Sequence, residues 1–351
     1  MTASTVEYRV FGHLAVTEKA RDAGTCETME ADIAIVALGW ETRFAAFENH
    51  LDLKVGKIVV LDFALKEANV PAVEENRRKL IAMGTRWGVE VTVITLEPSI
   101  EYQKNINLLD HLLTQMAASC GSYEGSLRKV FVECSTMPRI YIQWLIAVAF
   151  KKMSIQSLEF GYAEGIYGNA IGKEDFSSGL DRYVTVPHLQ GSGGMGEEKV
   201  LLVGIGGDAD VFYGLIDIVS PERISLLVPR SEKNAHIDAL LDQQVAKVRE
   251  THRLEDGEVR DIQAFGLMAH LDAFETYLDG FGSRAVVNVF VSGPKVQAIA
   301  AAVLACSDSR VHLKARIPTS YAHREVSANG RYHIYRLIDL TSPACSLPGT
   351  F

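Results

Sequence analysis

The chain carries the same strand-to-helix pattern twice, and this repeat restricts it to folds built from two similar halves. In each half an apolar run ends in a polar turn that contains glycine, at 33–43 and again at 200–210. Later in each half, an apolar run ends in a hydroxyl, a proline and a cation before an apolar helix, at 130–150 and at 286–306. A repeat this long indicates two whole domains rather than a solenoid of short units.

Within each half, short apolar runs alternate with helix-length amphipathic stretches. The runs are nearly continuous Val, Ile and Leu, as expected when helices cover both faces of a parallel sheet. The predicted strands are 32–38, 57–63, 89–96, 129–134 and 156–162, then 200–205, 224–229, 258–264, 285–291 and 310–316. The predicted helices are 41–50, 71–87, 101–119 and 138–152, then 209–219, 232–250, 266–280 and 294–306. The sequence therefore predicts an α/β fold of two tandem Rossmann-like doubly wound domains with mainly parallel sheets, related by internal duplication.

A glycine- and serine-rich segment interrupts this rhythm between the halves. It predicts a first domain over 1–168, a linker with a Gly-rich loop over 169–198, and a second domain over 199–351. One further strand is possible within the linker, at 182–187. Strands near the two termini, at 8–17 and 332–339, have no counterpart in the repeat, and we expect each to join the edge of a sheet.

The composition excludes several classes of protein. A net charge of −9 disfavours a protein that grips long nucleic acid, which needs a broad cationic face. The apolar runs are shorter than the roughly 20 residues of a membrane-spanning helix, and no charged-then-apolar signal pattern opens the chain. Five cysteines without a C-x-x-C pair argue against a disulfide framework and a structural zinc site. We expect a reduced, cytoplasmic protein that holds no metal.

Ligands of open α/β sheets bind beyond the carboxyl ends of the strands, where the strand order reverses. The turns after the first and fourth strands of each half are therefore the candidate sites, together with polar and aromatic residues after the fifth strand. The ligand-binding candidates are Gly39, Trp40, Glu41, Arg43, Ser135, Thr136, Arg139, Glu164 and Tyr167 in the first half, and Gly206, Gly207, Asp208, Ser292, Gly293, Lys295, Tyr321 and Arg324 in the second.

The turns after the fourth strands suit a phosphate, because hydroxyls, helix N-terminal N–H groups and a cation occur together there. Capping of the following helix explains one hydroxyl equally well. It does not explain Arg139, since a positive charge is unfavourable beside a helix N-terminus. For Lys295, a solvated lysine in the first helical turn is the alternative.

The glycine turn of the second half departs from the dinucleotide fingerprint G-x-G-x-x-G, because Ala209 stands at the third glycine position. A tight turn that lets a helix pack is as good an explanation as cofactor binding. No hydrolase, kinase or metalloprotease signature occurs, so the sequence identifies no catalytic residue and predicts no cofactor.

Two turns, Ser135-Thr136-Met137-Pro138-Arg139 and Ser292-Gly293-Pro294-Lys295, each followed by an apolar helix, resemble those of the CARF (CRISPR-associated Rossmann fold) sensor family. In that family the turn typically reads Thr/Ser-Gly-Gly-Thr-Lys, whereas both turns here place a proline before the cation. The resemblance covers about 32–168 and 199–339. It implies a nucleotide-binding sensor, with a cyclic oligonucleotide or related signal of bacterial antiviral defence as ligand.

The resemblance also implies a composite pocket in which Arg139 and Lys295 contact one anionic ligand from opposite sides. Any chemistry would be a ring-nuclease-like, metal-independent phosphodiester cleavage by positioning and electrostatics. Two alternatives stay open: a Rossmann-like enzyme that uses NAD(P) or S-adenosylmethionine, and a ligand-free scaffold that recruits a separate effector. The expected partners are a small anionic nucleotide and a separate effector protein, without long nucleic acid or membrane.

Overall fold

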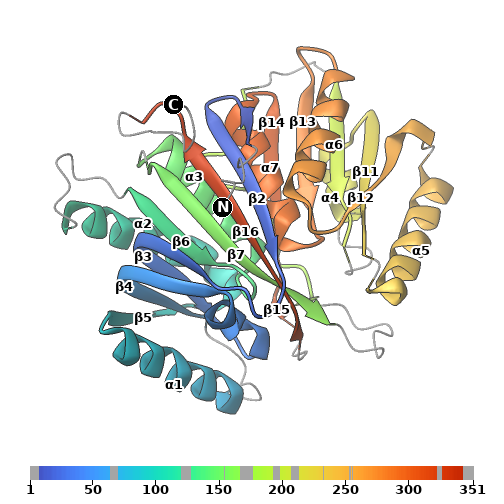
Figure 1. The fold of residues 1–351 in the computed structure, drawn as a ribbon. Coiled ribbons are helices and arrows are strands. Elements are labelled where there is room, and N and C mark those ends of the chain that lie inside the picture. The colour runs from blue at the N-terminus through green and yellow to red at the C-terminus, as the bar shows by residue number, and fades with distance from the viewer. Residues whose placement is uncertain are drawn as a thin grey trace, which may run out of the picture. The chain divides into compact units, whose positions relative to one another are not determined.

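The computed structural model describes residues 8–63, 70–119, 128–153, 155–166, 177–192, 198–206, 213–231, 233–252, 254, 256–321 and 326–342. The chain divides into two compact units (Figure 1). Unit 1 comprises Met1–Met137, Val148–Gly165 and Ala328–Phe351, and unit 2 comprises Pro138–Ala147 and Ile166–Ser327.

Unit 1 is built on one sheet, in the strand order β1-β2-β16-β7-β6-β3-β4-β5. Its strands are β1 (Arg9–Phe11), β2 (Leu14–Arg21), β3 (Glu27–Leu38), β4 (Leu51–Phe63), β5 (Glu90–Leu96), β6 (Lys129–Glu133), β7 (Ser157–Ile166) and β16 (Ser327–Asp339). The helical segments are η1 (Thr42–Asn49), α1 (Val70–Trp87), η3 (Ser99–Glu101), α2 (Tyr102–Ser119) and the last part of α3 (Arg139–Lys151). The β3–β4, β4–β5, β3–β6 and β6–β7 pairs are all parallel.

Unit 2 has a six-stranded sheet in the order β12-β11-β10-β13-β14-β9 and a two-stranded sheet of β15 and β8. Its strands are β8 (Ser177–Ser178), β9 (Arg182–Thr185), β10 (Lys199–Gly204), β11 (Arg223–Arg230), β12 (Val259–Gln263), β13 (Val286–Val291), β14 (Val311–Ile317) and β15 (Ser320–Tyr321). The helical segments are α4 (Tyr213–Val219), α5 (Ala235–Thr251), η4 (Asp256–Glu258), α6 (Leu267–Asp279) and α7 (Lys295–Ser307), with the first part of α3.

The two units repeat one topology. The parallel cores read β5-β4-β3-β6-β7 and β12-β11-β10-β13-β14, so in both the first strand of the core lies in the middle and the order reverses beside it. This is the doubly wound Rossmann-like arrangement. The predicted fold class, with two related domains and mainly parallel sheets, is confirmed.

The strands outside the repeat differ from the prediction in their placement. We expected 332–339 at an edge and assigned it to the second domain, but β16 lies inside the sheet of unit 1, between β2 and β7. It pairs antiparallel with β2 over eight residues. An antiparallel partner needs no crossover helix, so it can come from a distant part of the chain. In unit 2, β9 pairs antiparallel with β14 at the corresponding position.

Each unit has an apolar core on the face of its sheet. In unit 1, Phe44 and Phe47 of η1 and Leu80 of α1 pack against side chains of β3, β4 and β6. In unit 2, residues of α4 and α5 pack against β10 and β11, with Leu241 and Val248 among the fully buried members. The segment predicted as a helix at 41–50 is the tighter 3₁₀ helix η1, which carries these two phenylalanines into the core.

Candidate functional site

In unit 1, the strand order reverses between β3 and β6, and side chains fill the turns that meet there. A Cβ added at Gly39 would lie 3.0 Å from Thr136 Cβ, so the threonine already occupies the space over the glycine. Thr136 Oγ1 donates a hydrogen bond to Ala37 O (2.8 Å), and Asn76 Nδ2 donates one to Gly39 O (2.8 Å). Trp40 packs on the apolar core. These predicted residues hold the two turns together.

Arg43 is buried and bonded within unit 1. Its Nε donates to Glu41 Oε2 at 2.5 Å, and Nη1 lies 3.5 Å from Ala163 O. The guanidinium carbon also lies 5.8 Å from the ring centre of Tyr162, within the range of a cation–π interaction. The structure therefore brings the predicted residues Arg43 and Glu41 together as an internal ion pair.

A carboxyl group missed by the sequence analysis, that of Glu133, ends strand β6 and is fully buried. Tyr332 Oη donates a hydrogen bond to Glu133 Oε2 (2.6 Å), and Ser135 N donates one to Oε1 (2.9 Å). Burial raises the pKa of Glu133 to about 7, against the lowering effect of those hydrogen bonds. Ser135 Oγ accepts a hydrogen bond from Ala163 N (2.8 Å), so this predicted hydroxyl links β6 to β7.

The predicted residue Glu164 forms a second buried cluster in unit 1. Its Oε1 lies 2.7 Å from His333 Nε2, and its Oε2 accepts a hydrogen bond from Asn329 Nδ2 at 2.6 Å. Burial raises the pKa of Glu164, but the hydrogen bonds with His333 and Asn329 outweigh it, so the pKa lies below its ordinary value. Both partners come from β16, whose placement the sequence analysis did not foresee. That is why these contacts were missed.

In unit 2, the corresponding turns meet backbone to backbone. A Cβ at Gly206 would overlap the carbonyl of Ser292 and come within 2.6 Å of Gly293 N. Ser292 N and Oγ both donate to Gly204 O, at 2.8 and 3.3 Å. Gly293 N donates to Gln297 Oε1 (3.0 Å). Close packing therefore accounts for the glycine at 206 without a dinucleotide cofactor.

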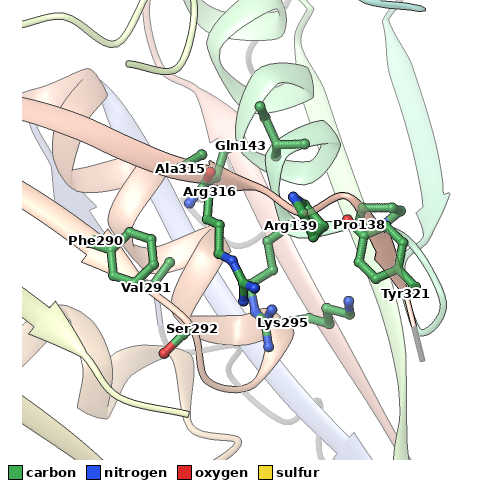
Figure 2. Close-up of a pocket in the computed structure, with 12 residues that line it drawn as sticks. Pro138, Arg139, Gln143, Phe290, Val291, Ser292, Lys295, Ala315, Arg316 and Tyr321 are labelled. Atoms are coloured by element: carbon green, nitrogen blue, oxygen red, sulfur yellow. The ribbon is translucent and has the colours of Figure 1, made fainter. Parts of the chain in front are cut away.

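A pocket opens in unit 2 beside these turns, with a volume of about 60 Å³ (Figure 2). It is lined by Pro138, Arg139, Ile140, Gln143, Phe290, Val291, Ser292, Lys295, Ala315, Arg316, Pro318 and Tyr321. All twelve residues belong to unit 2. Figure 2 shows the Arg139 and Arg316 side chains converging beside Ser292, while Lys295 extends toward Tyr321. The predicted residues Arg139, Ser292, Lys295 and Tyr321 thus share one pocket.

Three cations, Arg139, Lys295 and Arg316, line this pocket, and the described lining residues include no carboxylate. Arg139 Nε donates to Gly293 O (2.7 Å), and Arg316 Nη2 donates to Gly179 O (2.7 Å), so backbone carbonyls fix both guanidinium groups. Helices α3 and α7 begin at Arg139 and Lys295, which brings the positive ends of two helices to the pocket. The arrangement suits an anion.

Four predicted site residues lie outside the described part of the chain: Tyr167, Gly207, Asp208 and Arg324. The sequence analysis missed two of the polar residues that line the pocket. Arg316 stands at the carboxyl end of β14, a strand whose side chains alternate between buried and half-buried. A cation at the end of such a strand was the sequence signal that could have identified it. Gln143 interrupts the apolar run of α3, and an amide in such a run was the signal there.

Within the described ranges, no group of three or more His, Cys, Asp or Glu side chains is placed to hold a metal ion. The helices of the described segments include none that is long and apolar enough to cross a membrane.

Comparison with known proteins gives no family. No protein-family model matches the chain, and no curated protein is similar to it. Among solved structures, it resembles a functionally unknown protein from Pseudomonas aeruginosa PAO1, at 9% identity over 82% of this chain and 93% of that one, with a TM-score of 0.23. It also resembles a putative universal stress protein from Pseudomonas aeruginosa UCBPP-PA14, at 10% identity over 81% and 92%, with a TM-score of 0.22. At such TM-scores these likenesses carry no argument about function.

Proposed function

We propose that this protein is a nucleotide-binding sensor whose unit 2 pocket holds a phosphate of the ligand. The observation that carries the proposal is that three cations, Arg139, Lys295 and Arg316, line one small pocket. Guanidinium and ammonium groups are the usual protein partners of phosphate, and their hydrogen bonds to it are charge-assisted. The described lining residues supply no carboxylate, so an anion in the pocket meets only cationic, neutral polar and apolar side chains.

The size of the pocket limits what enters it. Pockets that enclose a whole small-molecule ligand measure about 300–1,000 Å³, whereas this one measures about 60 Å³. One phosphate with the adjoining atoms therefore fits inside, and the remainder of the ligand lies outside it. A multi-phosphate ligand such as a cyclic oligonucleotide, which the CARF resemblance implies, presents phosphates in this way. A separate effector protein of a bacterial antiviral system is the partner we propose to read the bound state.

The test is thermal unfolding of the purified protein against phosphate, mononucleotides, linear and cyclic di- to hexanucleotides, NAD(P) and S-adenosylmethionine. A ligand at 100 times its dissociation constant stabilises the folded state by about 2.7 kcal/mol, which gives a clear shift in Tm. The Arg139→Gln/Lys295→Gln double variant should lose the shift. A control variant, Lys104→Gln at an exposed position of α2, should keep it.

Each of the other outcomes favours a different function. A shift with NAD(P) or S-adenosylmethionine alone contradicts the sensor and favours the cofactor-dependent enzyme. The absence of any shift, with stable co-purification of a second protein, favours the scaffold. Incubation of the ligand that binds, without added metal, tests the predicted phosphodiester cleavage.

A further inference from the structure

Strand β14 of unit 2 carries a lysine that the proposed phosphate site leaves unassigned. The side chains of this strand alternate between buried and half-buried, and His312, Lys314 and Arg316 are the half-buried ones. Successive side chains of a strand point to opposite faces of the sheet, so these three share one face. Arg316 lines the pocket. Lys314 therefore stands next to the pocket on the same face, and its half-buried side chain keeps some surface open to solvent.

Two aromatic rings meet over this face of β14. The strand lies between β13 and β9 in the sheet. Phe290 of β13 is the register partner of Lys314, and Tyr183 of β9 is that of Arg316, so both rings are on the face that carries the lysine. The ring centres lie 6.0 Å apart in an edge-to-face arrangement. The lysine side chain therefore stands beside aromatic rings and is partly withdrawn from water.

Lys314 has a hydroxyl as its hydrogen-bond partner, not a carboxylate. Its Nζ donates to Thr185 Oγ1 at 2.9 Å, and within the described part of the chain it forms no ion pair. Its neighbours on this face of β14, His312 and Arg316, carry no negative charge. Burial lowers the pKa of Lys314 below its ordinary value, which raises the fraction of neutral amine at neutral pH. Desolvation and a neighbouring cation are two ways in which enzymes activate an amine.

From these contacts we infer that Lys314 is a nucleophilic amine that forms an imine with an aldehyde. The lone pair of the neutral Nζ attacks the carbonyl carbon, and the C–N bond forms as the π bond of the carbonyl opens onto its oxygen. The two protons of Nζ then leave with that oxygen as water, and a C=N bond remains. The condensation needs no oxidant or reductant.

The neighbouring Arg316 indicates which aldehyde suits the site. Residues two apart on a strand are separated by about 7 Å, a distance that a small phosphorylated aldehyde spans. Such a molecule has its phosphate held at the pocket by Arg316 and its carbonyl group beside Lys314. This preference for a phosphorylated aldehyde rests on the proposed phosphate site, whereas the imine chemistry does not.

The test uses pyridoxal 5′-phosphate and pyridoxal as probes, which share the aldehyde and differ in the phosphate. After borohydride reduction of the imine, peptide mass spectrometry gives the rate of labelling at each lysine. Pyridoxal 5′-phosphate should label Lys314 at least about tenfold faster than exposed Lys104, because a bound phosphate makes the attack intramolecular. Pyridoxal should label Lys314 more slowly than pyridoxal 5′-phosphate does, yet ahead of Lys104.

Lys314→Arg keeps the positive charge and removes the nucleophile, so the fast labelling should vanish, whereas the control Lys104→Arg should retain it. Lys314→Met replaces the first variant if that one unfolds. Fast labelling by pyridoxal 5′-phosphate at Lys295 in place of Lys314 overturns the inference while the phosphate site stands. Equal rates at Lys314 and Lys104 with both probes overturn it as well. If pyridoxal labels Lys314 ahead of Lys104 and the phosphate gives no acceleration, the nucleophilic amine stands and the proposed phosphate site is contradicted.

Discussion

The same register position holds a carboxyl group in one unit and a phenyl ring in the other. Glu133 of β6 pairs with Val36, three residues before Gly39, and Phe290 of β13 pairs with Val203, three residues before Gly206. Both side chains are buried. In unit 1 the carboxyl belongs to a network of internal hydrogen bonds, whereas in unit 2 the ring lines a pocket of cations.

This difference shows how one topology gives two electrostatic outcomes. In unit 1, the cation Arg43 is paired inside the unit with Glu41. In unit 2, Arg139 and Arg316 donate hydrogen bonds to the backbone carbonyls of Gly293 and Gly179, which fix their geometry beside the pocket. Both units thus have the same fold, and we propose that the anion pocket lies in unit 2.

The largest effect should come from Gly206 in unit 2, compared with the corresponding Gly39 in unit 1. Gly206→Ala forces a Cβ against the Ser292 carbonyl, so backbone must move, and we expect unfolding to become easier by at least about 3 kcal/mol. Gly39→Ala meets only the Thr136 side chain and should cost about 1 kcal/mol. Urea unfolding followed by circular dichroism measures both. Equal costs would contradict the difference in packing.

The next effect is the pH dependence of the free energy of unfolding that Glu133 of unit 1 should cause. The folded pKa of Glu133, about 7, lies above its ordinary value of 4.5. The folded protein therefore holds this proton more tightly, and the resulting stability, complete below pH 4.5, is lost as the pH rises through 7. Relative to Glu133→Gln, the wild-type free energy of unfolding should fall by about 3 kcal/mol between pH 4.5 and 7.5.

Glu164→Gln is the matched control for that experiment. The pKa of Glu164 is lowered, so its contribution has the opposite sign: it is present above the unfolded pKa and is lost as the pH falls through the folded one. The free energy of unfolding of the wild type minus that of Glu164→Gln should not decrease between pH 4.5 and 7.5. If Glu133→Gln behaves like this control, the buried carboxyl of unit 1 is not protonated as described.

A smaller effect should follow from Arg316→Gln in unit 2. Loss of one charge-assisted contact to phosphate costs about 1.5–3 kcal/mol, so binding should weaken by about ten- to a hundredfold. Arg182→Gln removes the same charge from an exposed position on β9 and should leave affinity within twofold. Calorimetric titration with the nucleotide found by thermal shift measures both. Equal losses in the two variants would indicate general charge attraction rather than this pocket.

The smallest effect separates the hydroxyls of the two turns. Thr136→Val should cost about 1 kcal/mol, because it removes a 2.8 Å hydrogen bond to Ala37 O. Ser292→Ala should cost less, since its hydroxyl bond is 3.3 Å long and Ser292 N still donates to the same carbonyl. Thermal unfolding of the two variants gives the order. A reversed order would contradict this ranking of the two hydroxyl contacts.

The sequence was sufficient for the parallel core of each unit, because continuous apolar runs and helix-length amphipathic stretches follow from local chemistry. It was insufficient where partners come from distant strands. Tyr332 and His333 reach Glu133 and Glu164 only because β16 enters the sheet of unit 1. Likewise, Arg139 and Lys295 were predicted from their turns, but Arg316 and Gln143 became candidates only once the fold placed them at the same pocket.

We propose that the cations of the unit 2 pocket bind the phosphate. Gln143→Glu tests it most directly, because this nearly isosteric change supplies the pocket with a carboxylate to pair with its arginines. Calorimetric titration of the folded variant with inorganic phosphate should show binding weakened at least about a hundredfold, while Gln103→Glu at an exposed position of α2 leaves binding unchanged. Unaltered phosphate binding by Gln143→Glu would contradict the account.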